Sequence, residues 1–376
     1  MASTPMDIDE TNSSSGAPAL NITRTLTSKV SSVISTFRPT KHFLRDGAKG
    51  SRLVPSVLSI DFDDPGELCM TSESDETIQI YNVKEGQHVK SLLSKKYGVK
   101  LAKFTHASSS IIYASTKQND AIRYLATHDN SFIRYFEGHE KSVTALAVHP
   151  SNDNFISCSL DGTVRLWNIG TKQWTTKVNV PFPRLAAWDP SGMVFAVACP
   201  KTSHVLFFDY RNIEKGPISV CDVLKKCGGA LMPRQQFAFS GGNSLQFSND
   251  GKHLLLGSRY QGHFLLDALD GSIKVYLKTP PGSMSGRTAP GESEAGKLES
   301  SGDCCFSPDG RYVLGGSNKG LLVWDTLATP GTDKTLEPTL VLEDKRAAEV
   351  VSFNPRFNMI ATADEELLFW LPDSNL

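Results

Sequence analysis

Short segments with alternating apolar and polar residues recur along most of this 376-residue chain. In the stretches 77–81 and 163–167 every second side chain is apolar, as expected for strands that bury one face against a neighbouring sheet. Turns such as Asp161-Gly162 and Asp309-Gly310 separate these segments and supply the glycine that a tight connection favours. The pattern predicts an all-β chain of many short antiparallel strands.

The predicted strands fall into repeats that two series of large residues mark. One series closes the third strand of each repeat, at Tyr81, Tyr124, Trp167, Phe208, Leu266, Trp324 and Trp370. The other closes the first strand, at Phe62, Phe104, Val148, Trp188, Phe247, Phe306 and Phe353. The intervals in the first series are 43, 43, 41, 58, 58 and 46 residues. Since a four-stranded propeller blade takes about 40 to 45 residues, we predict seven blades. The two long intervals indicate loop inserts at about 223–242 and 279–301.

The third repeat carries the most specific pattern. It has Gly138-His139 before its first strand, Asp161-Gly162 between its second and third strands, and Trp167 at the end of the third. This arrangement resembles a WD repeat. We therefore expect a single seven-bladed WD-repeat β-propeller over residues 25–373, preceded by a disordered extension at 1–24.

A propeller also has to close its ring. Trp370 lies six residues before the last residue, so we expect residues 36–44 to supply the outer strand of the last blade. A short helix is predicted just before it, with Thr25 as its cap. Its apolar positions recur at helical spacing: Leu26, Val30, Val33, Ile34 and Phe37.

Composition narrows the classes of partner and compartment. The net charge of −1 gives no overall field that would attract nucleic acid or a membrane surface. We find no run of 18 apolar residues, and the first residues lack the basic start and apolar core of a signal peptide, so a cytosolic or nuclear location is expected. Seven cysteines without a C-x-x-C pair indicate reduced thiols. We expect Cys304 and Cys305 to be core residues of a first strand rather than a vicinal disulfide.

His139, Ser157 and Asp161 are the residue types of a catalytic triad, but with Trp167 they match the hydrogen-bonded structural tetrad of a WD blade. We interpret them as structural. The nine histidines show no metal-ligand spacing, and no glycine doublet is followed by a phosphate-loop lysine. Neither a metal nor another cofactor is predicted.

The remaining candidates are surface residues at the entrances of the first strands, which a propeller gathers at one face. Aromatic and arginine side chains are frequent in binding hot spots. The candidate partner-binding residues are Tyr97, Lys141, Phe182, Arg184 and Arg346. Isolated solvated positions remain the alternative for each of them, and for the basic run at Lys95, Lys96, Lys100 and Lys103.

Strings within and after the second repeat are more specific than the general blade pattern. They are 94–99 (SKKYGV), 122–125 (IRYL), 133–139 (IRYFEGH), 208–211 (FDYR), 353–357 (FNPRF) and 369–372 (FWLP). They closely resemble the nuclear WD-repeat protein family shared by the COMPASS histone methyltransferase and, in fungi, the cleavage and polyadenylation factor. The resemblance covers roughly residues 26–373.

The resemblance implies a nuclear adaptor without catalysis of its own. Its expected partners are the catalytic methyltransferase subunit and other WD-repeat subunits of COMPASS, subunits of the cleavage and polyadenylation factor, a phosphatase scaffold, and the phosphorylated tail of RNA polymerase II. Such a subunit would couple histone H3 lysine methylation and transcript 3′-end processing to transcription. A substrate receptor of a ubiquitin ligase, or another scaffold propeller such as a trafficking coat subunit, is the competing interpretation, because these proteins share the fold.

Overall fold

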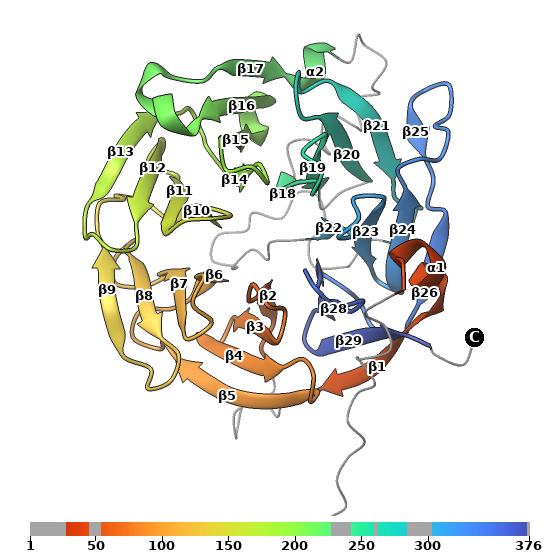
Figure 1. Cartoon of the computed structure of the whole chain (residues 1–376), viewed down its shortest axis with the longest axis horizontal. Helices are drawn as coiled ribbons and strands as arrows, with labels where there is room; N and C mark the ends of the chain where they lie inside the picture. The colour runs from red at the N-terminus through yellow and green to blue at the C-terminus, as the bar shows by residue number, and fades with distance from the viewer. Residues whose placement is uncertain (1–27, 45–53, 227–241, 259–261, 284–302, 374–376) are drawn as a thin grey trace, which may run out of the picture.

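The computed structural model describes residues 28–44, 54–226, 242–258, 262–283 and 303–373. These residues form seven sheets arranged around a central axis, as Figure 1 shows, and all but one short strand pair in them are antiparallel. Each sheet is one blade, and its first strand lies nearest the axis. The predicted seven-bladed all-β propeller is confirmed.

Each of the first four blades uses four consecutive strands. Blade 1 comprises β2 (Val57–Phe62), β3 (Leu68–Glu73), β4 (Thr77–Asn82) and β5 (Gln87–Leu93). Blade 2 comprises β6 (Lys100–Phe104), β7 (Ser110–Ala114), β8 (Ile122–Ala126) and β9 (Phe132–Phe136). Blade 3 comprises β10 (Val143–Val148), β11 (Asn154–Ser159), β12 (Thr163–Asn168) and β13 (Trp174–Asn179). Blade 4 comprises β14 (Leu185–Trp188), β15 (Val194–Cys199), β16 (His204–Asp209) and β17 (Ser219–Asp222).

The last three blades depart from this simple order. Blade 5 comprises β18 (Gly242–Phe247), β19 (His253–Ser258), β20 (Gly262–Asp267) and β21 (Ile273–Lys278). Blade 6 comprises β22 (Cys304–Phe306), β23 (Tyr312–Ser317), β24 (Gly320–Asp325) and β26 (Leu340–Glu343). The connection from β24 to β26 adds β25 (Thr335–Leu336), which pairs in parallel with β21 of blade 5. Blade 7 comprises β27 (Val350–Phe353), β28 (Ile360–Ala363), β29 (Leu367–Pro372) and β1 (Phe37–Phe43).

The ring closes between the two ends of the chain, as predicted. Strand β1 pairs antiparallel with β29, in a register that runs from Phe37 opposite Pro372 to Phe43 opposite Leu367. Alternate residues of β1 face inward, and Phe37 is completely buried. Its ring meets the edge of Phe353 at 5.9 Å between centroids. The outer edge of β29 is thereby covered by a strand from the start of the chain.

The helix before this strand is shorter than predicted. Helix α1 (Val30–Val33) has one turn and continues into the 3-10 turn η1 (Ile34–Thr36). Phe37 belongs to the predicted strand at 36–44 and not to the helical spacing that also included it, because Phe37 begins β1 and its pairing with β29 buries it between blades 6 and 7. Lys29 occupies the capping position, without a side-chain cap, and the expected cap Thr25 lies outside the described residues.

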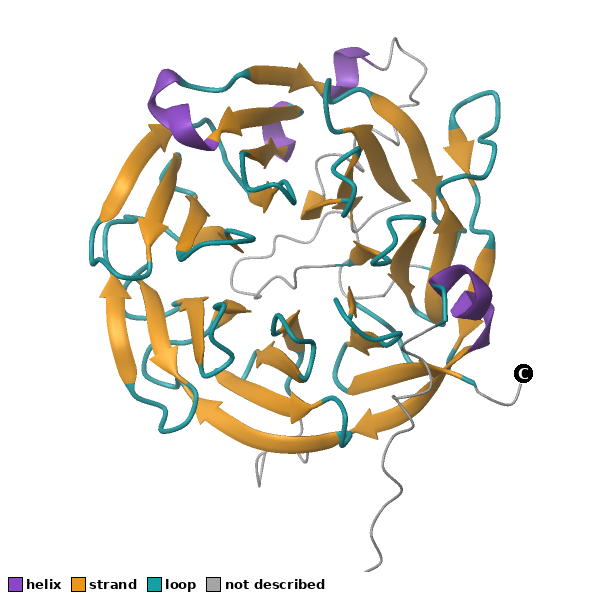
Figure 2. Cartoon of the chain, viewed as in Figure 1, coloured by secondary structure: helices purple, strands orange, loops and turns teal. Residues whose placement is uncertain are grey.

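Other helical turns lie in the connections of blade 4, two at the rim of the ring and one, between β15 and β16, further in (Figure 2). They are η2 (Pro200–Thr202), η3 (Tyr210–Lys215) and α2 (Val223–Lys226). Helix α2 opens the first expected insert, whose last residue, Gly242, begins β18. The rest of that insert, most of the second insert and the expected extension at 1–24 lie outside the described residues.

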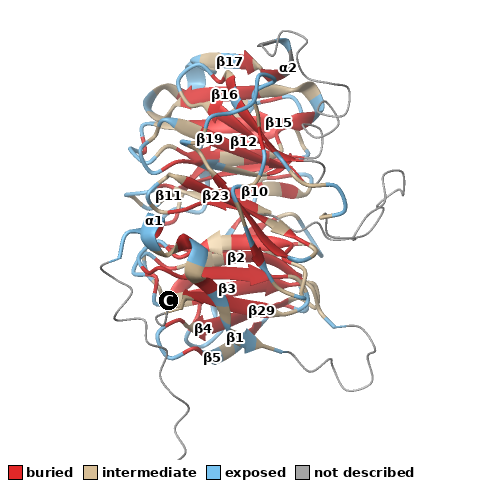
Figure 3. Ribbon diagram, turned by 90° about the vertical axis from the view of Figure 1, so that its right-hand side faces the viewer, coloured by how far each residue is buried: buried red, intermediate tan, exposed pale blue. Residues whose placement is uncertain are grey.

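The hydrophobic core is divided into clusters that join consecutive blades, so that burial is concentrated between the sheets (Figure 3). One cluster joins blades 2 and 3 through Phe136, Phe155 and Trp167, and another joins blades 7 and 1 through Tyr81 and Phe369. The residues that close the first and third strands lie in these clusters, which explains why they recur in the sequence. The described cysteines are buried, and Cys304 and Cys305 lie in β22 as expected.

One of the repeat-marking residues needs correction. Phe155 pairs with Trp167 in blade 3, and in blade 2 the equivalent Ile111 pairs with Leu125. Leu125, not Tyr124, therefore corresponds to Trp167. A shift of one residue reverses which face of the sheet a side chain occupies. Tyr124 and Leu125 are both large and apolar, so the spacing between repeats did not show which of them corresponds to Trp167.

Candidate partner-binding surfaces

The propeller presents two faces with different connections. Face A, as we call it, carries the connections from each outer strand to the next inner strand and the turns between second and third strands. Face B carries the remaining turns. In blade 3 the Asp161 turn meets His139 of the preceding connection on face A. The antiparallel order of each blade places the equivalent connections on the same face.

The four residues of the predicted tetrad are joined by a chain of hydrogen bonds on this face. The Trp167 indole N–H donates to Ser157 Oγ at 2.8 Å, and Ser157 Oγ lies 2.7 Å from His139 Nε2. His139 Nδ1–H donates to Asp161 Oδ2 at 2.9 Å. Asp161 also accepts from the hydroxyl of Thr163 at 2.6 Å. Each donor in this series of hydrogen bonds has an acceptor when the His139 imidazole is neutral and carries its proton on Nδ1.

The electrostatics of this chain favour the same protonation. Burial lowers the pKa of His139. The hydrogen bond to Asp161 raises this pKa but offsets the effect of burial only in part. Burial alone would raise the pKa of Asp161, but hydrogen bonds from Thr163, His139 and the Glu140 N–H hold it at about 2. Ser157 is completely buried, so no substrate reaches its hydroxyl. The geometry suits a structural role, and that role remains a prediction.

Other blades keep only parts of this arrangement. In blade 7, the Trp370 indole N–H donates to Thr362 Oγ1 at 2.9 Å. In blade 6, Gly315 occupies the position of that hydroxyl residue, and within the described structure the buried indole nitrogen of Trp324 finds no partner. A histidine of blade 5, His263, packs edge-on against Trp324 at 5.5 Å between centroids. Blade 6 therefore replaces the hydrogen bond by packing.

Tyr97, the first candidate partner-binding residue, lies in the connection from β5 to β6. The guanidinium of Arg123 lies 3.4 Å from the centre of its ring, and Phe132 meets the ring at 5.5 Å. Because Arg123 is on the third strand of blade 2 and Phe132 on the outer strand, the expected position of Tyr97 around the central channel is wrong. Tyr97 packs over the outer half of blade 2.

The other four candidates also lie in connections of face A. Lys141 is exposed between β9 and β10, and Phe182 is exposed between β13 and β14. Arg184 follows in the same connection, half-buried, with its backbone N–H donating to Ala198 O at 3.1 Å. Arg346 is half-buried between β26 and β27, and its Nε lies 3.0 Å from Asp344 Oδ1. The structure thus brings Phe182 and Arg184 together and leaves Tyr97 and Arg346 in other blades.

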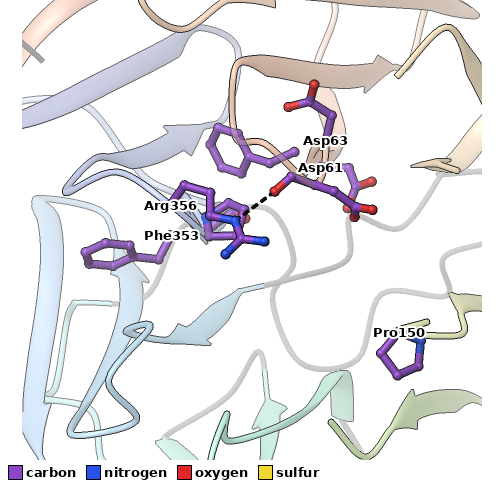
Figure 4. Close-up of a pocket in the computed structure, with 9 residues that line it drawn as sticks. Asp61, Asp63, Pro150, Phe353 and Arg356 are labelled. Carbon is purple, nitrogen blue, oxygen red and sulfur yellow. Dashed lines mark hydrogen bonds between the residues drawn. The ribbon is translucent and has the colours of Figure 1, made fainter. Parts of the chain in front are cut away.

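A cavity of about 400 Å³ on face B was not predicted. It lies where the inner strands of blades 7 and 1 end, and Pro150 of blade 3 borders it (Figure 4). Asp61, Asp63 and Asp64 line one side, and Arg356 donates from Nε to Asp64 O at 3.1 Å. Three aspartates within four residues were a visible signal in the sequence.

The carboxylates of this cavity already have partners. Asp61 contacts Lys103 Nζ at 2.7 Å and accepts from the Phe104 N–H at 2.8 Å, although burial raises its pKa. Asp64 pairs with His106 at 2.7 Å, and that hydrogen bond raises the pKa of His106. These contacts tie blade 1 to blade 2. Lys103 belongs to the basic run for which the sequence left a solvated surface as the alternative. The structure instead holds Lys103 in an ion pair with Asp61.

The described ranges contain no group of three or more His, Cys, Asp or Glu side chains that could hold a metal ion. They also contain no helix with the length and apolar content needed to cross a membrane.

Comparisons with known proteins agree with this architecture. The family model described as "WD domain, G-beta repeat" matches residues 130–168 and 300–325. The "Set1 complex component swd2" of Schizosaccharomyces pombe is 31% identical over 358 residues, covering 87% of this chain and 95% of that protein. The "COMPASS component SWD2" of Saccharomyces cerevisiae is 33% identical over 321 residues, covering 84% and 91%. "WD repeat-containing protein 82" of Drosophila melanogaster is 32% identical over 346 residues, covering 92% and 97%.

The chain belongs to the Swd2 and WD repeat-containing protein 82 family. Identity at this level over almost the full length of three relatives decides the assignment. It confirms the resemblance found in the sequence. Membership of the Swd2 family makes the chain a WD-repeat propeller protein that is not itself an enzyme.

Proposed function

We propose that this chain is a non-catalytic, nuclear adaptor subunit of a Set1/COMPASS-type histone H3 lysine methyltransferase complex. Its partners are then the catalytic methyltransferase subunit and other WD-repeat subunits. We extend the proposal to the cleavage and polyadenylation factor, to a phosphatase scaffold and to the phosphorylated tail of RNA polymerase II. In this role the chain couples histone methylation and 3′-end processing to transcription.

One observation carries the proposal. Two yeast relatives that match the chain over 84% or more of its length are named as components of the Set1 complex or COMPASS. The partners beyond COMPASS are supported by the similarity of the strings in blades 2, 4 and 7 to the same family.

The physical form of the molecule suits an adaptor. Its seven blades are joined by buried clusters, so the connections on face A are mounted on a rigid ring. A rigid surface loses little conformational freedom on binding, and a few anchors then supply most of the affinity. We propose Tyr97, Lys141, Phe182, Arg184 and Arg346 as candidate anchors.

The test is affinity purification of the tagged full-length chain from nuclear extract, followed by quantitative mass spectrometry. The proposal expects a SET-domain methyltransferase and other WD-repeat subunits, with cleavage and polyadenylation factor subunits as a second set. Recovery of cullin-ligase adaptors or coat subunits in their place would favour the competing scaffold functions. No specific observation on this chain favours those functions at present.

A further inference from the structure

Two large apolar side chains stand exposed on face A where blades 3 and 4 meet. Phe182, in the connection from β13 to β14, is 52% exposed, and Leu160, in the turn from β11 to β12, is 53% exposed. The segments that carry them are tied to neighbouring backbone. The Leu160 N–H donates to Ser142 O at 3.0 Å, and the Thr144 hydroxyl donates to Pro183 O at 3.1 Å. The two segments that carry these side chains therefore lie close together on face A, where blade 3 meets blade 4.

The backbone holds Phe182 outward at an unfavourable geometry. Its φ is +52°, in the left-handed region that a bulky residue rarely adopts. It stands between two prolines, of which Pro181 is exposed and Pro183 is buried. Glycine or asparagine would fit this position without strain. An exposed aromatic ring in a strained position contributes little to the core, and such strain gathers at functional sites.

Cationic side chains surround the ring. Lys201 Nζ of blade 4 lies 4.2 Å from the centre of the Phe182 ring, Arg184 follows two residues later, and Lys141 is exposed in the preceding connection. Neither Lys141 nor Lys201 forms an ion pair with any residue that the structure describes. The exposed acid beside them is Glu140. The two exposed lysines, Lys141 and Lys201, outnumber the exposed Glu140 and give this surface a positive local charge on a chain whose net charge is −1.

We propose that this surface, the 160/182 patch formed by Leu160, Phe182, Lys141, Arg184 and Lys201, docks an acidic peptide segment that carries an apolar anchor residue. The inference rests on the proposed function and names the chemistry of the partner segment. Carboxylates of the segment pair with Lys141 and Lys201 beside Arg184, and its anchor packs against Phe182 and Leu160. Aromatic and arginine anchors of this kind dominate the energy of interfaces.

The surface fits a peptide better than a single-stranded nucleic acid. Strand-binding proteins use a continuous basic groove with several aromatic rings on which successive bases stack. Here a single exposed ring stands beside an aliphatic residue, and Leu160 offers no flat face for a base. The cations are few and lie on both sides of the apolar pair.

The test uses the purified full-length chain and three fluorescein-labelled probes. The first is a peptide in which aspartates and glutamates flank Leu and Phe. The second has lysines in place of the acids, and the third is a single-stranded oligonucleotide. Fluorescence polarisation at two salt concentrations gives the affinities. We expect the acidic peptide to bind, more weakly at high salt, and the lysine peptide not to bind. Tighter binding of the lysine peptide or of the oligonucleotide would overturn the proposal.

Two variants and a control assign the binding to the patch. Phe182→Gly removes the anchor and relieves the strained backbone, so we expect a loss of affinity of about tenfold or more with an unchanged or higher melting temperature. Lys201→Glu should weaken binding at low salt more than at high salt. The control Leu269→Ala removes an 89% exposed side chain from face B and should leave affinity unchanged. If Phe182→Gly lowers the melting temperature and leaves affinity intact, the ring is structural and the proposal fails.

The outcome can be separated from that of the proposed function. Recovery of a Set1-type complex by the wild-type chain tests the proposed function alone. If Phe182→Gly recovers that complex as well as the wild type, only the docking inference fails. If the acidic peptide binds through the patch but no methyltransferase is recovered, only the proposed function fails.

Discussion

Closure of the ring by β1 yields the prediction that the structure quantifies best. Phe37→Ala removes a completely buried aromatic side chain from the cluster between blades 6 and 7. Such a truncation costs about 3 to 5 kcal/mol of unfolding free energy, because apolar contacts are lost and a cavity remains. We expect the urea midpoint, followed by tryptophan fluorescence, to fall by about 1 M or more for an m-value of about 3 kcal/mol/M.

The control for this variant comes from the same strand. Thr40 is exposed and its hydroxyl donates to the Arg38 carbonyl in its own strand, so Thr40→Ala should change the unfolding free energy by less than about 0.5 kcal/mol. Deleting residues 1–20 should leave the midpoint unchanged, whereas deleting residues 1–44 removes β1, exposes an edge of blade 7 and should cause aggregation. Equal midpoints for Phe37→Ala and Thr40→Ala, or a monomeric 1–44 deletion with unaltered stability, would refute the closure.

Three further predictions address the tetrad, a buried histidine and the candidate anchors. Asp161→Ala leaves the Nδ1–H of His139 without its acceptor and should lower the unfolding free energy by about 1 to 3 kcal/mol; an unchanged urea midpoint would exclude a structural role. Burial lowers the pKa of His263 to about 4, against about 6.5 when unfolded, so the unfolded state takes up a proton first as the pH falls. The stability that the neutral His263 contributes is present above pH 6.5 and declines towards pH 4, by about 2 kcal/mol between pH 6.5 and 5. His263→Gln should therefore reduce the loss of unfolding free energy on acidification. An equal loss in the variant would contradict the assignment. Tyr97→Ala combined with Arg184→Glu should lower recovery of both proposed complexes, at about 1 to 4 kcal/mol of binding free energy per anchor, and full recovery at normal melting temperature would move the docking site elsewhere.

The blade architecture was predictable because its determinants are local and repeated. The apolar residues that close the first and third strands form the clusters between consecutive blades. Each blade therefore needs a large apolar residue at the same two positions, and these residues recur in the sequence. Closure by β1 followed from counting strands. The one register error, Tyr124 for Leu125, arose where both neighbours are large and apolar.

Apart from the closure by β1, the following contacts between distant segments were not predictable. Strand β25 has two residues and exists because Leu336 pairs with Leu277 of another blade. His263 fills space beside Gly315 and Trp324 that no spacing rule indicates. The position of Phe182 on face A followed from its place before the first strand of blade 4. Its positive φ and the position of Lys201 Nζ over its ring could not be predicted from the sequence.

Immunodepletion of this chain from nuclear extract tests the central claim most directly. Mass spectrometry of the depleted extract would quantify the SET-domain methyltransferase subunit of the Set1 type, and an assay on histone H3 would measure its activity. If the chain is a subunit of that complex, the methyltransferase and its H3 lysine methylation activity should fall in parallel with the chain. Complete removal of the chain with an undiminished methyltransferase level and activity would contradict the account.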